Sequence, residues 1–123
     1  MSWTVLFHTE FEPEFCELPK SVREELLAHA KLLETFGPQL GRPRADTLNG
    51  SKHANMKELR FYSDNGVWRV AFAFDPERQA VLLVAGDKAG TTENRFYKTL
   101  IKTADTRFDA HLTEKALKKG GKG

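Results

Sequence analysis

Three short apolar runs separated by tight turns constrain the fold more than any other feature of this chain. The first run ends at residues 63–66, Ser-Asp-Asn-Gly, and an Asn-Gly pair between apolar runs is a strong β-hairpin signal. The second run ends at residues 75–78, Asp-Pro-Glu-Arg, which also favours a turn. Parallel strands need much longer crossovers, so the spacing predicts an antiparallel meander with strands at residues 57–62, 67–74 and 80–85.

The residues before the meander predict one strand and two helices. Aromatic and β-branched side chains at residues 3–8 favour a strand, and residues 10–16 favour a short helix. Ser21 and Glu24 have the spacing of a capping box, which predicts the start of a longer helix. The Gly-Pro pair at residues 37–38 is expected to end that helix.

The segments on either side of the meander complete an α+β fold. Residues 38–55 are rich in Pro, Gly, Asn, Ser and Arg, which predicts a long surface loop. From Glu93 onward, apolar side chains at every fourth position predict a helix long enough to cover the sheet. We therefore expect one domain, residues 1–114, in which the helices pack on one face of the sheet. A basic, glycine-rich and flexible tail is expected at residues 115–123.

Charge and cysteine content narrow the function classes. The net charge of +2 is unevenly distributed, because residues 1–41 carry −4 and the rest of the chain carries +6. A basic face that binds phosphate and two merely solvated surfaces are both compatible with this asymmetry. With one cysteine and scattered histidines, the sequence predicts no disulfide, no metal site and no cofactor. No apolar run is long enough for a membrane span and no signal peptide is recognisable, so we expect a cytoplasmic protein.

Strand alternation predicts a cationic site on one face of the meander. If the apolar side chains face the core, then Arg60 and Arg69 share the opposite face of neighbouring strands. Ala71 and Ala73 would leave that face concave, and Lys88 would follow at the end of the next strand. The alternative is an exposed sheet on which Arg60 pairs with a nearby carboxylate. On that alternative Arg69 is a surface residue, and its replacement by alanine should change stability by no more than roughly 0.5 kcal/mol.

Several short motifs resemble those of one protein family. The chain resembles the RelE/ParE toxin superfamily, in its phage-derived HigB-like branch, from about Phe7 to Leu112. The motifs that carry the resemblance are Leu48-Asn49-Gly50, Lys57-Glu58-Leu59-Arg60-Phe61, Trp68-Arg69-Val70-Ala71-Phe72, Leu82-Leu83-Val84-Ala85-Gly86-Asp87-Lys88, Phe96-Tyr97-Lys98, Ala104-Asp105 and Arg107-Phe108.

The resemblance implies the toxin of a type II toxin–antitoxin pair. RelE-like members cleave mRNA in the ribosomal decoding site without metal, whereas ParE-like members share the fold and inhibit DNA gyrase. An antitoxin, often a helix-turn-helix protein in this branch, would be the partner. We expect a ribosome-dependent endoribonuclease. A ParE-type gyrase inhibitor without nuclease activity and an inactive phage-derived remnant are the alternatives.

The resemblance also implies roles for individual residues. The arginine that RelE-like enzymes place against the scissile phosphate matches Arg69, the basic residue after the last strand matches Lys88, and the base-stacking aromatic residue matches Tyr97. Arg60 completes the expected catalytic set. Glu58 occupies a position that is lysine in some members, so the general base stays open.

Further basic residues are expected to bind RNA. Arg42, Arg44, Lys52 and His53 lie in the predicted loop, and Lys57 begins the first meander strand. His53 is the histidine best placed for proton transfer, although the histidine that some HigB-type toxins carry before the Leu-x-Gly motif is absent. Alternation turns Lys57 toward the other face of the sheet.

Overall fold

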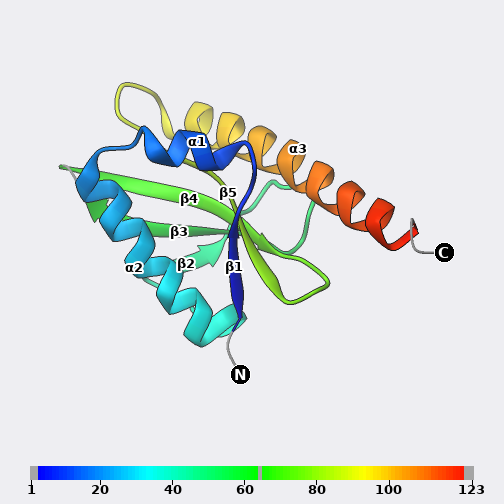
Figure 1. Ribbon diagram of the computed structural model, residues 1–123. Helices are drawn as coiled ribbons and strands as arrows, with labels where there is room; N and C mark the ends of the chain where they lie inside the picture. The colour runs from blue at the N-terminus through cyan, green and yellow to red at the C-terminus, as the bar shows by residue number, and fades with distance from the viewer. Residues whose placement is uncertain (1–2, 64, 121–123) are drawn as a thin grey trace.

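The computed structural model describes residues 3–63 and 65–120 and contains a five-stranded mixed sheet flanked by helices (Figure 1). The strands are β1 (Thr4–Phe7), β2 (Ala45–Thr47), β3 (Met56–Ser63), β4 (Gly66–Phe74) and β5 (Gln79–Asp87). The helices are α1 (Phe11–Cys16), α2 (Lys20–Phe36), the short 3-10 helix η1 (Gly37–Gln39) and α3 (Glu93–Gly120).

The predicted meander forms the centre of the sheet. Strands β3, β4 and β5 pair antiparallel in sequence order, and the spatial order of the whole sheet is β1-β5-β4-β3-β2. Strand β1 pairs with β5 in parallel, and β2 pairs antiparallel with β3 at the other edge. The α+β class and the meander are therefore confirmed.

Helices cover both faces of the sheet, so the predicted packing on one face is wrong. Leu59, Val70 and Phe72 belong to one apolar cluster that includes residues of α1 and α2. Ala71 and Ala73, on the opposite face, belong to a second cluster that includes residues of α3. Successive strand residues point to opposite faces, and α2 and α3 lie on opposite sides of the sheet (Figure 1). Strand β4 is consequently covered on both faces, by α2 on one and by α3 on the other.

Three local predictions also differ from the structure. The N-cap of α2 is Pro19, so Ser21 lies inside the helix and does not cap it. The predicted loop at residues 38–55 contains η1 and β2, because the apolar side chains of Leu40 and Leu48 are buried and bring this segment onto the sheet. The predicted flexible tail continues α3 as far as Gly120, and residues 121–123 lie outside the described residues.

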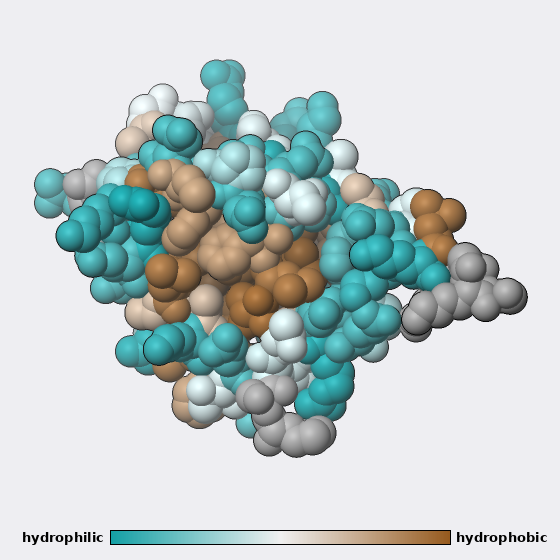
Figure 2. Space-filling view, in the orientation of Figure 1, coloured by the Kyte–Doolittle hydropathy of each residue, from teal (hydrophilic) through white to brown (hydrophobic). Residues whose placement is uncertain are grey.

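The face seen in Figure 2 carries apolar side chains at its centre, in the region of β1 and between α1 and α2. Val5, Phe7, Phe15 and Leu32 are partly buried hydrophobic residues of these elements. None of the helices in the described part of the chain combines the length and the apolar character that a bilayer crossing requires.

Candidate functional site

Three polar side chains from β3, β4 and α3 form a hydrogen-bonded chain. The Nε of Arg69 donates to the Tyr97 hydroxyl at 2.6 Å, and this hydroxyl donates to Oε1 of Glu58 at 2.8 Å. Arg69 Nε and Glu58 Oε1 are 4.0 Å apart. The strand register explains the meeting, because Arg60 pairs with Arg69 and Glu58 with Ala71, which places Glu58 and Arg69 on one face.

This Glu58–Tyr97–Arg69 chain is buried. The side chains of Arg69 and Glu58 are only 3% and 7% exposed. The Arg69 guanidinium also lies over the rings of Phe96 and Tyr97, at 5.6 and 5.4 Å from their centroids. The expectation of an exposed Arg69 on an open, concave face is therefore wrong. Strand alternation identified the face correctly but could not show that α3 covers it.

Burial changes the pKa values of Glu58 and Tyr97 in this hydrogen-bonded chain. Desolvation raises the pKa of Glu58 above its usual value, although the Tyr97 hydrogen bond and the charges of Arg60 and Arg69 lower it in part. Desolvation also raises the pKa of Tyr97, and the hydrogen bond and charge of Glu58 add to the increase. Glu58 is thus a stronger base than an exposed carboxylate, and Tyr97 keeps its proton.

A groove of about 740 Å³ adjoins Arg69. Its basic residues are Arg42 and Arg44, before β2, together with Arg60 and Arg69. Strand β2 pairs only with residues 57–59 of β3, so the end of β3 is left at the sheet edge, where the groove forms. We refer to this surface as the arginine groove. It is further lined by Glu25, His29, Pro43, Asp46, Phe61, Tyr62 and Val67.

Backbone and side-chain contacts fix the walls of the arginine groove. The Arg60 amide donates to the Arg44 carbonyl at 2.9 Å, which holds the segment before β2 against β3. Arg42 Nε donates to Asp46 Oδ2 at 2.9 Å. A hydrogen bond from the Thr47 amide and the one from Arg42 lower the pKa of Asp46, so this carboxylate stays ionised. The Arg42 side chain is 82% exposed and remains accessible to a ligand.

Five predicted site residues do not line the arginine groove, and one of them, Tyr97, is the hydrogen-bond partner of Arg69 described above. Lys52 and His53 bind Asp109 on α3, and the His53 Nε2 to Asp109 Oδ1 distance is 2.8 Å. They tie the segment before β3 to α3. Lys57 pairs with Phe72 on the α2 side of the sheet, as alternation predicted. Lys88 is exposed after β5 and does not line the groove.

Two residues of the site escaped the sequence interpretation. The resemblance gives no role to Glu58, which stands where some members have lysine, and none to Tyr62. Both alternate with Leu59 and Phe61 along β3, so strand alternation alone places them on the face of Arg60. Exposure distinguishes the two, since Glu58 is 6% and Tyr62 81% exposed, and the sequence pattern does not report exposure.

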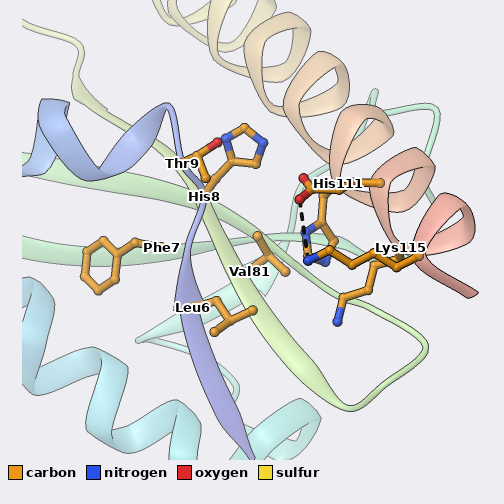
Figure 3. A pocket seen from close by; sticks show the side chains of 9 residues that line it. Leu6, Phe7, His8, Thr9, Val81, His111 and Lys115 are labelled. Atoms are coloured by element: carbon orange, nitrogen blue, oxygen red, sulfur yellow. Dashed lines mark ion pairs between the residues drawn. The ribbon is translucent and has the colours of Figure 1, made fainter. Parts of the chain in front are cut away.

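A smaller hollow of about 210 Å³ lies at the opposite edge of the sheet, between β1 and α3 (Figure 3). His8 and the basic residues of α3 line it, but His111 and Lys115 of this helix already have acidic partners. His111 binds Asp75 at 2.8 Å, and Lys115 is paired with Glu77. In the arginine groove Arg42 and Arg69 also have acidic partners, but Arg44 and Arg60 form no ion pair with any of the described residues. A cation whose charge is unmatched attracts an anion more strongly, so the arginine groove is the better candidate for an anionic ligand.

Comparison with known proteins shows related sequences and a related fold. A family described as phage-derived protein Gp49-like matches residues 13–109. The candidate toxin HigB2 of Mycobacterium tuberculosis is 46% identical over 98 residues, which are 79% of this chain and 48% of HigB2. The candidate toxin HigB3 of the same organism is 42% identical over 108 residues, which are 88% of this chain and 92% of HigB3. The chain therefore spans about half the length of the first relative and nearly all of the second.

A solved structure supports the fold. The free state of a doubly substituted variant of the E. coli toxin RelE matches with a TM-score of 0.59 and 16% sequence identity. The match covers 82% of this chain and 95% of that chain.

Proposed function

The chain belongs to the phage-derived Gp49-like family and is a HigB-like member of the RelE superfamily, and from this premise we propose that it blocks translation by cutting mRNA on the ribosome. In this proposal it is the toxin of a toxin–antitoxin pair, acts in the cytoplasm, and is neutralised by a cognate antitoxin. The observation that carries the proposal is the buried Glu58–Tyr97–Arg69 chain beside the arginine groove.

RNA supplies its own nucleophile, so the protein needs only charge stabilisation and proton transfer. Glu58 takes the proton of the 2′-hydroxyl, and the 2′-oxygen forms a bond to phosphorus. Arg69 stabilises the additional negative charge on the phosphate oxygens. The bond from phosphorus to the 5′-oxygen breaks, which leaves a 2′,3′-cyclic phosphate and a 5′-hydroxyl. The 5′-oxygen takes the Tyr97 proton, and Tyr97 recovers a proton from Glu58 along their 2.8 Å hydrogen bond.

Burial of the reactive groups fits a need for the ribosome. With Arg69 and Glu58 almost inaccessible, a free RNA meets the arginine groove before it meets these groups. The Tyr97 hydroxyl occupies the Nε of Arg69, so a phosphate contacts Arg69 through its terminal guanidinium nitrogens while the Tyr97–Glu58 hydrogen bond stays in place. We therefore expect slow cleavage of free RNA and faster cleavage when the ribosome holds the mRNA in place.

The test is induction of the chain in bacteria, with translation measured by amino-acid incorporation and transcript ends mapped by sequencing. We expect arrested translation with cuts inside reading frames. Glu58→Gln and Arg69→Lys keep the shape of the site, and each should reduce cleavage, the former by about 10²–10⁴-fold. Glu24→Gln, on the exposed surface of α2, is the control and should behave as the unchanged protein. Intact transcripts during arrest would contradict the proposal, and filamentation with an SOS response would indicate gyrase inhibition.

A further inference from the structure

Tyr62 is the most exposed of the large apolar side chains that the structure describes, with 81% of its surface accessible. It lies near the end of β3 and lines the arginine groove. We propose that Tyr62 is a stacking platform for the nucleobase next to the scissile phosphate, while Arg42 and Arg44 hold the RNA backbone. This inference rests on the proposed function and identifies the ligand of the groove as single-stranded RNA.

The fold itself gives little reason for this side chain. A ring that is 81% exposed buries little apolar surface, so it adds little to the core. Tyr62 pairs across the sheet with Val67, and such a pair contributes only modestly to a sheet. An exposed aromatic residue among arginines is, by contrast, the combination that binds single-stranded nucleic acids, where cations follow the backbone and rings stack on bases.

The register places Tyr62 one step from the reactive groups. Tyr62 and Arg60 are two residues apart on one face of β3, which corresponds to about 6.6 Å. Arg69 lies directly across from Arg60 on β4. A step of this length is comparable to one nucleotide. A phosphate held near Arg60 and Arg69 would therefore place the neighbouring base over the Tyr62 ring.

The arrangement favours RNA over an acidic peptide. An acidic peptide would be attracted by Arg42 and Arg44 but would leave the exposed face of Tyr62 in water. A nucleic acid strand offers both charged phosphates and flat bases at regular intervals, and the groove offers both arginines and an exposed ring. Stacking and backbone contacts can also be separated experimentally, because only the first requires a base.

The experiment measures binding of a short 2′-O-methyl RNA by fluorescence anisotropy, beside the same oligonucleotide with abasic positions. This probe has no free 2′-hydroxyl and cannot be cut. We expect Tyr62→Ala to weaken binding of the base-bearing strand by about 5- to 150-fold and to leave the abasic strand unchanged. Tyr62→Trp should preserve the preference for bases. Arg44→Ala should weaken binding of both strands.

Phe36→Ala is the matched control, because Phe36 is an aromatic residue that is 49% exposed and does not line the groove. It should bind both strands as the unchanged protein does. Equal effects of Tyr62→Ala on the two strands, or no binding of either strand by the unchanged protein, would overturn the inference. An acidic peptide that displaces the base-bearing strand and the abasic strand at the same concentration would also overturn the inference.

The assay contains no ribosome, so its outcome is separate from that of the proposed function. Base-dependent binding without mRNA cuts in cells would contradict the nuclease only. Cuts in cells, with unchanged binding by Tyr62→Ala, would contradict the stacking platform only.

Discussion

Arg69 and Glu58 bring opposite charges into the protein interior, and neither is more than 7% exposed at its side chain. Removing one member of a buried pair leaves the other charge uncompensated, which is strongly unfavourable. We expect Arg69→Ala to lower the free energy of unfolding by about 3 kcal/mol or more. In a Glu58→Gln background the same change should cost less, by about 0.5–3 kcal/mol. Urea unfolding of the unchanged protein, the two single variants and the double variant measures this difference. Strictly additive losses would show that the two side chains do not interact.

The raised pKa of Glu58 predicts the pH dependence of cleavage. Glu58 must be ionised to accept the 2′-hydroxyl proton, and its pKa lies above the ordinary 4.5 because of burial. Cleavage on ribosomes should therefore fall as the pH drops through this raised pKa, at a pH where an exposed carboxylate would still be ionised. Glu58→Gln should remove this dependence together with most of the rate. An unchanged pH profile in Glu58→Gln would assign the base to another group.

The raised pKa of Glu58 also means that ionising this carboxyl group lowers the stability of the folded protein. The folded state binds the Glu58 proton more tightly than the unfolded state does, so ionising Glu58 costs stability. This penalty is present above the folded pKa and disappears as the pH falls toward the unfolded value. A stronger base is thus obtained at the expense of folding stability, as is common at functional sites.

Exposure is the property that residue patterns did not reveal at this site. Alternation predicted that Arg60 and Arg69 share one face, and the register confirms it. Alternation gives no information on which elements cover a side chain. It therefore predicts an exposed Arg69, but Arg69 is buried, whereas Tyr62 is exposed. Contacts between β4 and a helix that begins only at Glu93 depend on tertiary packing, which a period of two residues cannot report.

At the scale of elements, the end of α2 depends on one glycine. Gly37 follows the helix with φ of 55°, and a Cβ at this position would lie 2.2 Å from Nε1 of Trp3. Gly37→Ala must therefore strain the backbone and displace the indole, which should cost at least about 2 kcal/mol of unfolding free energy. Chemical denaturation measures this loss.

Gly90 provides the control for this prediction. Its φ of 80° is also positive, but among the described residues no neighbouring atom lies within 4 Å of where a Cβ would stand. Gly90→Ala should therefore show the backbone cost alone. Equal losses in Gly37→Ala and Gly90→Ala would show that the Trp3 contact contributes nothing.

Elements with a strong local signal were predictable from the sequence, and those that depend on distant partners were not. The Asn-Gly turn, the alternation of β4 and the four-residue period of α3 each depend on neighbouring residues, and all three elements are present. Strand β2 has three residues and exists only through its pairing with residues 57–59 of β3. A strand that short has no period of its own, so residues 38–55 resembled a loop.

At the scale of the whole molecule, charge is unevenly distributed along the chain and over the surface. The acidic first 41 residues form β1, α1 and α2, whereas three of the four groove arginines are exposed or partly exposed near the β2 edge of the sheet. The net charge of +2 therefore understates the field that a nucleic acid meets at the groove. One acidic residue of α2, Glu25, lies within this groove, while its neighbour Glu24 does not line it.

This pair of glutamates tests whether the groove carries the binding energy. Contacts of Arg42, Arg44 and Arg60 with three phosphates predict that log K falls with log salt concentration with a slope of about −2. Glu25→Gln removes a negative charge from the groove and should strengthen oligonucleotide binding about twofold at low salt, from roughly 0.5 kcal/mol for unit charges about 8 Å apart in water. Glu24→Gln makes the same chemical change one residue away and should have a smaller effect. The advantage of Glu25→Gln should vanish at high salt, because screening shortens the reach of exposed charges. Equal effects of the two substitutions would mean that RNA responds to the net charge of the protein and does not bind in the arginine groove.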